Sequence, residues 1–313
     1  MKSDEKGTTM TDRIDFTGRV AVVTGGGGGL GRAYCLGLAA RGAKVVVNDL
    51  GGAVDGAGGD ATPAQRVAEE IRSAGGEAVA DATDITDRAA VTAMIDATVD
   101  RWGSVDLLVN NAGVLRDRSF AKMDPADFDM VVGVHLTGTV NCTRAAWPHM
   151  IAAGYGRVLL TTSTSGIYGN FGQSNYGAAK SGLVGLMNVL AIEGAAKGVR
   201  VNAIAPTAAT RMTEGLLSPE AADALTPESI VPGALFLLSE QAPTKTILGA
   251  GAGTFAVSRM VESPGVYLPE LARTPEIVAE RWAEISDPTG EAPLETAGDQ
   301  TRKYLRRVTG DRG

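Results

Sequence analysis

Cysteine is scarce in this chain of 313 residues: Cys35 and Cys142 are the only two, and they lie far apart. Without a CxxC spacing they indicate neither a disulfide framework nor a metal centre, so we expect a reducing compartment and no bound metal. No apolar run is long enough to span a bilayer. The first ten residues, MKSDEKGTTM, are polar and mixed in charge, which is unlike a secretory signal.

Basic residues are also in deficit, because 29 Lys and Arg stand against 36 Asp and Glu, for a net charge of −7. This balance argues against general binding to nucleic acid or to membrane surfaces. The last three residues, Asp311, Arg312 and Gly313, do not form a peroxisomal targeting tripeptide. We therefore expect a soluble cytoplasmic protein, and the charge balance is compatible with a local basic patch for one phosphorylated ligand.

Glycine, in contrast, is abundant, and its 41 residues gather in particular loops. Between these loops, short and almost continuously apolar runs alternate with longer helix-like segments. We expect strands at 19–25, 44–49, 76–81, 105–111, 156–163 and 199–206, with one more near 246–257. Regular alternation of buried strands and helices predicts an α/β fold, namely a Rossmann-type, doubly wound parallel sheet in a single domain.

The two ends of the chain differ from this pattern. Residues 1–12 are predicted to be disordered, and the sheet domain is expected to span 13–260. In the tail, 261–313, prolines precede a helix that should begin near Thr274-Pro275-Glu276, and a second helix is expected over 299–308. This tail is too short for an independent domain. We expect a helical C-terminal extension that packs on the main domain or on a partner subunit.

The run TGGGGGLG at 24–31 follows the first strand and opens a helix. Glycines there permit a tight turn and let backbone N–H groups approach a pyrophosphate, although a plain flexible turn would look similar. Asp49 ends the next strand, where dinucleotide sites place the acid that binds the ribose hydroxyls. A carboxylate at that point repels a 2′-phosphate, so NAD is favoured over NADP; the alternative is that Asp49 caps a turn.

The segment SNYGAAKSG at 174–182 places Tyr176 and Lys180 on one face of a helix. Together with the glycine loop and the NNAG of 110–113, this order of motifs resembles the short-chain dehydrogenase/reductase family. Ser163 stands at the position of the family's catalytic serine. The resemblance implies that Tyr176 is the general acid/base, that Lys180 lowers the pKa of Tyr176 and binds the nicotinamide ribose, and that Ser163 donates a hydrogen bond to the substrate oxygen.

The same resemblance implies a set of residues around the cofactor. Asp84 matches the family's adenine-contacting acid, and Asn111 opens the NAG that braces the glycine loop. The predicted NAD site comprises Thr24, Gly25, Gly29, Leu30, Gly31, Asp49, Asp84, Ile85, Asn111, Ala112, Gly113, Tyr176, Lys180, Pro206, Thr207 and Thr210.

Two positions depart from the family pattern. His135, in VHLTG, stands where many members carry an asparagine that props a proton-relay water. It either makes the same structural hydrogen bond or acts as a catalytic relay group that titrates near pH 6.5. In APTAAT, Thr207 replaces the glycine of a PG pair, and Thr210 is expected to contact the nicotinamide carboxamide. His149 is expected to be a helix-end residue without a catalytic role.

Further segments resemble the (3R)-hydroxyacyl-CoA dehydrogenase branch of the family; they lie at 45–52, 113–123, 144–150, 165–176, 204–213 and 273–287. This implies a free-standing, NAD-dependent oxidoreductase that interconverts (3R)-3-hydroxyacyl-CoA and 3-oxoacyl-CoA. One alternative is a hydroxysteroid or other secondary-alcohol dehydrogenase without a CoA requirement. A remote alternative is a non-catalytic NAD-binding assembly protein.

Substrate and partner contacts stay open at this level. Tyr168 and Phe171 either line a pocket wall or pack within a tight turn, and the cations of LRDRSFAK at 115–122 either meet CoA phosphates or are solvated, with Arg116 paired to Asp117. The helical segments 128–147 and 176–195 carry small residues on one face. Close helix contacts of that kind favour a homodimer or homotetramer.

Overall fold

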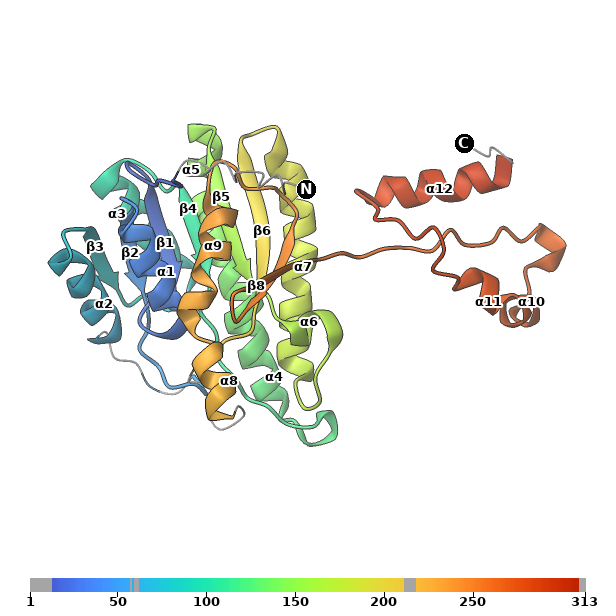
Figure 1. Ribbon diagram of the computed structural model, residues 1–313, viewed down its shortest axis with the longest axis horizontal. Helices are drawn as coiled ribbons and strands as arrows, with labels where there is room; N and C mark the ends of the chain where they lie inside the picture. Colours follow the sequence, from blue (N-terminus) through green and yellow to red (C-terminus); the bar gives the residue numbers. More distant parts are fainter. Residues whose placement is uncertain (1–12, 57, 59–61, 211–217, 310–313) are drawn as a thin grey trace, which may run out of the picture. The chain divides into compact units, whose positions relative to one another are not determined.

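The computed structural model describes residues 13–56, 58, 62–210 and 218–309. The segment 1–12, for which disorder was predicted, lies outside the described residues. The chain divides into two compact units, one that ends at Val257 and one that begins at Ser258 (Figure 1). This division lies three residues before the boundary that we expected at 260–261.

The first unit is built on an eight-stranded sheet with the order β3-β2-β1-β4-β5-β6-β7-β8. The strands are β1 (Val20–Thr24), β2 (Lys44–Asn48), β3 (Glu77–Asp81), β4 (Leu107–Asn110), β5 (Gly156–Thr161), β6 (Val199–Pro206), β7 (Ile247–Gly251) and β8 (Thr254–Ser258). Neighbours from β3 to β7 pair in parallel. The order reverses between β1 and β4, which makes this edge the ligand-binding switch point of a doubly wound sheet. The predicted fold class is confirmed.

The prediction of a single strand near 246–257 is wrong, because the structure has two strands there, β7 and β8. They are joined by Ala252 and Gly253, whose φ angles are both positive, at 48° and 73°. Positive φ at both central residues is the type I′ turn, which lets a chain reverse between adjacent antiparallel strands. An alanine at the first turn position is an uncommon signal for this turn.

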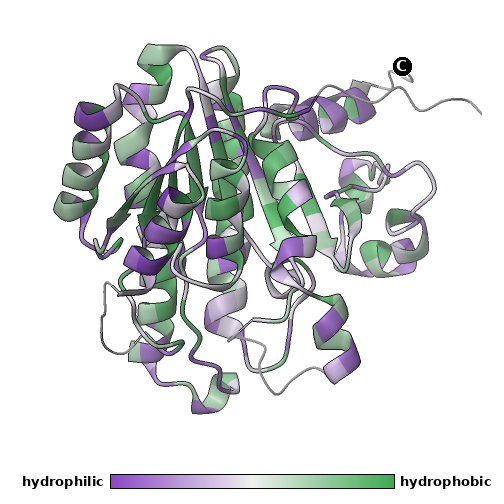
Figure 2. Cartoon of the chain, turned by 60° about the vertical axis from the view of Figure 1, so that its left-hand side comes forward, coloured by the Kyte–Doolittle hydropathy of each residue, from purple (hydrophilic) through white to green (hydrophobic). Residues whose placement is uncertain are grey.

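Helices cover both faces of the sheet. One layer consists of α1 (Gly29–Ala39), α2 (Thr62–Ser73) and α9 (Val231–Leu238). The other consists of α3 (Arg88–Trp102), α5 (Thr139–Ala153) and α7 (Ser174–Ala195). Leu38 of α1 and Leu183 of α7 are buried in the two separate cores. The strands between these layers are mostly hydrophobic (Figure 2), as strands buried on both faces must be.

Shorter elements fill the connections of this unit: α4 (Pro125–Val132), α6 (Thr164–Tyr168), α8 (Pro219–Ala224), the π-helix η2 (Gly133–Gly138), and the 3₁₀ turns η1 (Phe120–Lys122) and η4 (Pro227–Ser229). The helical segment expected at 128–147 therefore runs through α4, η2 and α5. Its π-helical turn carries His135, and π-turns inside helices frequently occur at functional sites.

The second unit holds η5 (Glu270–Ala272), α10 (Pro275–Glu280), α11 (Trp282–Ile285) and α12 (Ala297–Thr309). Thr274 caps α10 by accepting the Ile277 N–H, and Pro275 takes the first helical position. Lys303 of α12 is ion-paired to Glu262 at 2.8 Å. Both helices that the sequence predicts in this tail are present.

Candidate active site

The loop between β1 and α1 is packed so closely that side chains are excluded. A Cβ on Gly31 would stand 1.9 Å from the Gly25 carbonyl oxygen, and one on Gly25 would stand 2.8 Å from the Ala112 Cα. Asn111 donates its side-chain N–H groups to the carbonyl oxygens of Thr24 and Gly25, at 3.2 and 3.1 Å. Because these glycines carry no side chain and the loop is fixed by Asn111, the loop backbone can approach a ligand closely.

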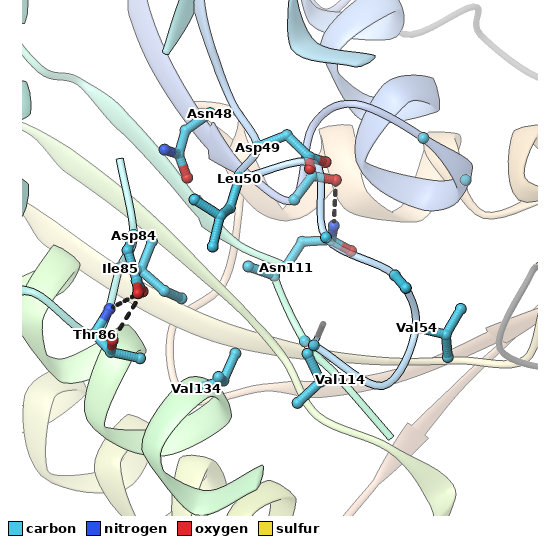
Figure 3. A pocket seen from close by; sticks show the side chains of 18 of the residues that line it. Asn48, Asp49, Leu50, Val54, Asp84, Ile85, Thr86, Asn111, Val114 and Val134 are labelled. Carbon is cyan, nitrogen blue, oxygen red and sulfur yellow. Dashed lines mark hydrogen bonds between the residues drawn. The ribbon is translucent and has the colours of Figure 1, made fainter. Parts of the chain in front are cut away.

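Beside this loop lies a pocket of about 460 Å³ (Figure 3). Its lining includes ten of the residues predicted to bind the cofactor: Gly25, Gly29, Leu30, Asp49, Asp84, Ile85, Asn111, Ala112, Gly113 and Thr210. The other six, Thr24, Gly31, Tyr176, Lys180, Pro206 and Thr207, are not among its lining residues. Sequence reasoning missed several apolar lining residues, among them Leu50, Val54, Val114 and Val134. For Leu50, Val54 and Val114, the available signal was their position shortly after the apolar runs 44–49 and 105–111.

Asp49 faces the pocket from the end of β2. Its Oδ2 accepts the Gly27 N–H at 2.8 Å, and its Oδ1 accepts the Gly51 N–H at 2.7 Å. Because each carboxylate oxygen has two lone pairs, both oxygens can accept a further hydrogen bond from a ribose hydroxyl. The turn-capping alternative describes the same contacts, and the two roles are compatible at this position.

Asp84, Ile85 and Thr86 form another part of the pocket wall (Figure 3). Asp84 Oδ1 accepts hydrogen bonds from the backbone N–H and the hydroxyl of Thr86, both at 2.8 Å. Tightly packed glycines, two carboxylates that accept hydrogen bonds and apolar walls together fit a dinucleotide.

Ser163 and Tyr176 are brought together from different elements. Ser163 follows β5 and caps α6 by accepting the Ser165 N–H at 3.2 Å, while Tyr176 lies in the first turn of α7. The Ser163 hydroxyl acts on the Tyr176 phenol and favours its ionised form. Burial raises the pKa of Tyr176, the hydrogen bond from Ser163 lowers it, and the charge of Asp117 raises it, so the net shift is upward. The lowered pKa that we expected combines the charge of Lys180 with that of the bound nicotinamide, and it stays a prediction; among the protein's own groups, burial outweighs the other effects.

Lys180 lies one helical turn beyond Tyr176 and is buried. Its Nζ donates a hydrogen bond to the Thr161 carbonyl oxygen at 2.5 Å and stands 5.5 Å from the centre of the Tyr176 ring. Burial lowers the pKa of this ammonium to about 7. The ammonium can therefore lose or hold a proton near neutral pH, right beside the phenol.

His135 is buried against the same tyrosine. Its Nε2 lies 2.8 Å from the Val114 carbonyl oxygen and 3.1 Å from the Val114 nitrogen. Burial, together with the charge of Lys180, moves the pKa of His135 well below 6.5. The interpretation of His135 as a catalytic relay group that titrates near pH 6.5 is wrong for this reason. The structural hydrogen bond is the role that the geometry supports.

Several neighbouring residues also find their places. Thr210 lines the pocket near Gly29, and the Thr207 N–H donates to the Ala250 carbonyl oxygen at 2.8 Å, as part of the connection from β6. Arg211 of the same loop lies outside the described residues. His149, near the end of α5, is 3.6 Å from Asp96.

The residues around the predicted substrate side are exposed. Tyr168 is 73% and Phe171 is 90% exposed, so the alternative that they pack within a tight turn is wrong. Arg116 is ion-paired to Asp127 at 2.6 Å, and not to Asp117. Asp117 accepts a hydrogen bond from Gln173 instead.

Comparison with known proteins agrees with this geometry. The family model described as short chain dehydrogenase matches residues 19–221, and the chain belongs to that family of oxidoreductases. A short-chain type dehydrogenase/reductase of Mycobacterium tuberculosis is 47% identical over 273 residues, which cover 87% of this chain and 95% of that protein.

The peroxisomal multifunctional enzyme type 2 of Drosophila melanogaster is 48% identical over 279 residues, which cover 88% of this chain and 46% of that enzyme. The solved structure of its full-length form superposes with a TM-score of 0.80 and 39% identity, covering 95% of this chain and 50% of that chain. This chain thus spans about half the length of that multifunctional relative.

A 7α-hydroxysteroid dehydrogenase, solved with NADH and 7-oxo glycochenodeoxycholic acid, superposes with a TM-score of 0.68 and 30% identity. That match covers 76% of this chain and 95% of the dehydrogenase. Family membership and this neighbour together indicate a nicotinamide cofactor. Separately, none of the helices in the described part of the chain is both long enough and apolar enough to cross a membrane.

Proposed function

We propose that this protein is an NAD-dependent oxidoreductase that interconverts (3R)-3-hydroxyacyl-CoA and 3-oxoacyl-CoA. The observation that carries the proposal is that Ser163 acts on the Tyr176 phenol while the buried Lys180 ammonium stands 5.5 Å from the centre of the same ring. Two hydroxyl groups in contact, next to a buried amine, can hold an alcohol oxygen and accept its proton. The segments that resemble (3R)-hydroxyacyl-CoA dehydrogenases support the substrate class.

In the proposed reaction, Tyr176 accepts the proton of the substrate hydroxyl. Ser163 donates a hydrogen bond to the same oxygen and stabilises its developing negative charge. Lys180 in its charged form favours the phenolate of Tyr176. NAD, when bound by the glycine loop, Asp49 and the other pocket residues, supplies the hydride acceptor.

The choice of NAD over NADP is proposed from Asp49. Its carboxylate lines the pocket and is held in place by the Gly27 and Gly51 N–H groups. A fixed negative charge at this point repels a 2′-phosphate and accepts hydrogen bonds from ribose hydroxyls.

An acyl-CoA substrate is supported by the composition of the surrounding loops. Phe120, Tyr168 and Phe171 are large apolar side chains left mostly exposed. Arg118 and Lys122 lie in the same loop as Phe120 and can offer cations to CoA phosphates. We propose that the aromatic residues contact the acyl chain and that these cations contact the nucleotide part of CoA.

A second candidate is a hydroxysteroid dehydrogenase without a CoA requirement, which the bile-acid complex of the structural neighbour favours. The test is kcat/KM for a (3R)-3-hydroxyacyl-CoA, for its CoA-free analogue and for steroid alcohols, each with NAD and with NADP. We expect the CoA ester with NAD to be the best pair. Equal kcat/KM for the CoA-free analogue would favour the second candidate.

The Tyr176→Phe variant controls for the chemistry. It should retain NAD binding and lose roughly 10²- to 10⁴-fold in kcat, as expected for loss of a general base. Unchanged turnover of the alcohol would remove Tyr176 from the mechanism and would revive the non-catalytic alternative.

We also propose that the protein is a homodimer or homotetramer. Val189 and Ile192 on α7 are each 53% exposed, and apolar side chains on a long helix are commonly covered by a second copy. The extension 261–313 is proposed to pack on the main domain or on a partner subunit. Sedimentation velocity should show a dimer or tetramer, and a monomer at all concentrations would contradict this.

Cytoplasmic location is likewise a proposal, supported by the acidic balance of the sequence. The Drosophila relative is named as peroxisomal. Imaging of a fluorescent fusion in the native host separates the two compartments.

A further inference from the structure

The side-chain amide of Gln173 joins two segments next to the catalytic pair. Its Oε1 accepts a hydrogen bond from the Ser165 hydroxyl at 2.7 Å, and its Nε2 donates one to Asp117 Oδ2, also at 2.7 Å. Ser165 in turn donates its backbone N–H to the hydroxyl oxygen of Ser163. One amide therefore links the loop after β4 to the turn that carries Ser163.

The backbone around Gln173 is fastened to the same loop. Asn175 is fully buried; its Nδ2 donates to the Arg116 carbonyl oxygen at 2.9 Å and its Oδ1 accepts the Tyr176 N–H at 2.7 Å. That N–H belongs to the first turn of α7, where backbone donors have no carbonyl partner within the helix. The Arg118 N–H also donates to the Gly172 carbonyl oxygen at 2.9 Å. These hydrogen bonds fix the main chain on both sides of Gln173, so the position of its side-chain amide is well defined.

We propose that Gln173 is a positioning residue for the dehydrogenase reaction. The two ends of its amide hold Ser165 and Asp117. Through Ser165 it keeps Ser163 against Tyr176, and through Asp117 it sets the distance between that carboxylate and the Tyr176 phenol. An amide suits this place because one end accepts and the other donates. A carboxylate at position 173 could accept from Ser165 but could not donate to Asp117. The inference rests on the proposed function.

Because Gln173 holds Asp117, the place of Gln173 also affects the electrostatics of the catalytic pair. It raises the pKa of Tyr176, since a nearby anion disfavours the phenolate. Within the part of the chain that the structure describes, the other ionisable groups in ring contact with the tyrosine are Lys180 on α7 and His135 on the π-helix. Burial lowers the pKa of both, and His135 is neutral at working pH. Gln173 therefore controls how far the negative charge of Asp117 stands from Tyr176.

Three variants test the proposal by the pH profile of kcat for alcohol oxidation. Gln173→Leu removes both hydrogen bonds without adding charge, and should lower kcat roughly 10- to 100-fold while KM for NAD stays unchanged. Gln173→Glu adds a negative charge beside Asp117 and should move the rising limb of the profile to higher pH. Asp117→Asn removes the charge and should move that limb to lower pH.

The matched control is Gln241→Glu, the same chemical change at an exposed residue between α9 and β7, where the profile should not move. A second readout follows tyrosinate absorbance on titration with base, as the difference between each protein and its Tyr176→Phe counterpart. The Tyr176 transition should shift down in Asp117→Asn and up in Gln173→Glu. This readout requires no turnover.

The outcomes separate the two proposals. If the parent protein oxidises alcohols but Gln173→Leu keeps the parental kcat and pH profile, the positioning role is overturned and the proposed function stands. If the parent oxidises no alcohol, the proposed function fails. Should the Gln173 variants not fold, as judged by circular dichroism, an unshifted Tyr176 titration in Asp117→Asn overturns the inference.

Discussion

The ring of His135 stands edge-on to the ring of Tyr176, with their centres 5.1 Å apart and their planes at 89°. The same imidazole contacts the backbone of Val114, and a Cβ on Gly113 would come within 2.1 Å of it. His135 therefore fills the space between the segment after β4 and the catalytic tyrosine. It acts through packing and one hydrogen-bonded contact while its ring stays neutral.

This burial predicts a stability effect below neutral pH. In the unfolded chain His135 takes up a proton near its ordinary pKa of about 6.5, whereas in the folded protein its pKa lies well below that value. The unfolded state thus binds more protons in this window, so the free energy of unfolding falls as pH drops from about 6.5 through the folded-state pKa. His135→Gln should flatten this part of the stability curve, measured by denaturant unfolding across the pH range.

His149 provides the control, because it is the other histidine of the chain and is partly exposed. His149→Gln is measured beside it as the same substitution at a partly exposed histidine. If His135→Gln showed the parental slope below pH 6.5, the buried imidazole would not be its source.

Asp49 should control the choice of dinucleotide. Asp49→Ala removes the carboxylate that faces the ribose position, and the ratio of kcat/KM for NAD to kcat/KM for NADP should fall roughly 10- to 100-fold. Steady-state kinetics with both cofactors measures this ratio. Asp100→Ala, on the exposed side of α3, is the matched control. An unchanged ratio in Asp49→Ala would assign specificity to other residues.

The buried charge of Lys180 should lower the free energy of unfolding, although the residue is needed for catalysis. Its pKa of about 7 in the folded protein lies below the unfolded value near 10.4, because burial disfavours the charged form. The penalty is therefore largest below about pH 7 and shrinks as pH rises toward the unfolded pKa. Lys180→Met should be more stable than the parent at pH 6, with a smaller advantage at pH 9.

The same variant should lose roughly 10²-fold or more in kcat, since the tyrosine loses its cationic neighbour. Thermal melts at the two pH values and an activity assay check both parts. A Met variant that is less stable at pH 6 would show that the hydrogen bond to Thr161 outweighs the cost of burying the charge.

Gly31 should tolerate no side chain. Gly31→Ala places a methyl group on the Gly25 carbonyl, so the loop must move, and Kd for NAD should rise roughly 10- to 100-fold by calorimetric titration. Gly185→Ala in α7 makes the same change where the added carbon meets no atom within 4 Å beyond the neighbouring backbone of its own helix. It should leave Kd for NAD unaltered. Equal Kd values for the two variants would contradict the close-packed loop.

Local patterns in the sequence sufficed for those features that neighbouring residues decide. The alternation of apolar runs and helices predicted the doubly wound sheet, and Thr274 with Pro275 predicted the start of α10. Motif order placed the glycine loop, Asp49 and Asp84 around one ligand, and all three line the same pocket. Such features depend on backbone preferences and on a periodicity that a short segment carries within itself.

Tertiary structure alone decided what depends on burial and on contacts between distant segments. The upward shift in the pKa of Tyr176 and the neutral state of His135 follow from how completely each ring is enclosed. The contact of Gln173 with Asp117 spans 56 positions of the chain. Solvent exclusion and distance between remote charges set these properties, because the energy of a charge depends on everything packed around it and not on its neighbours in sequence.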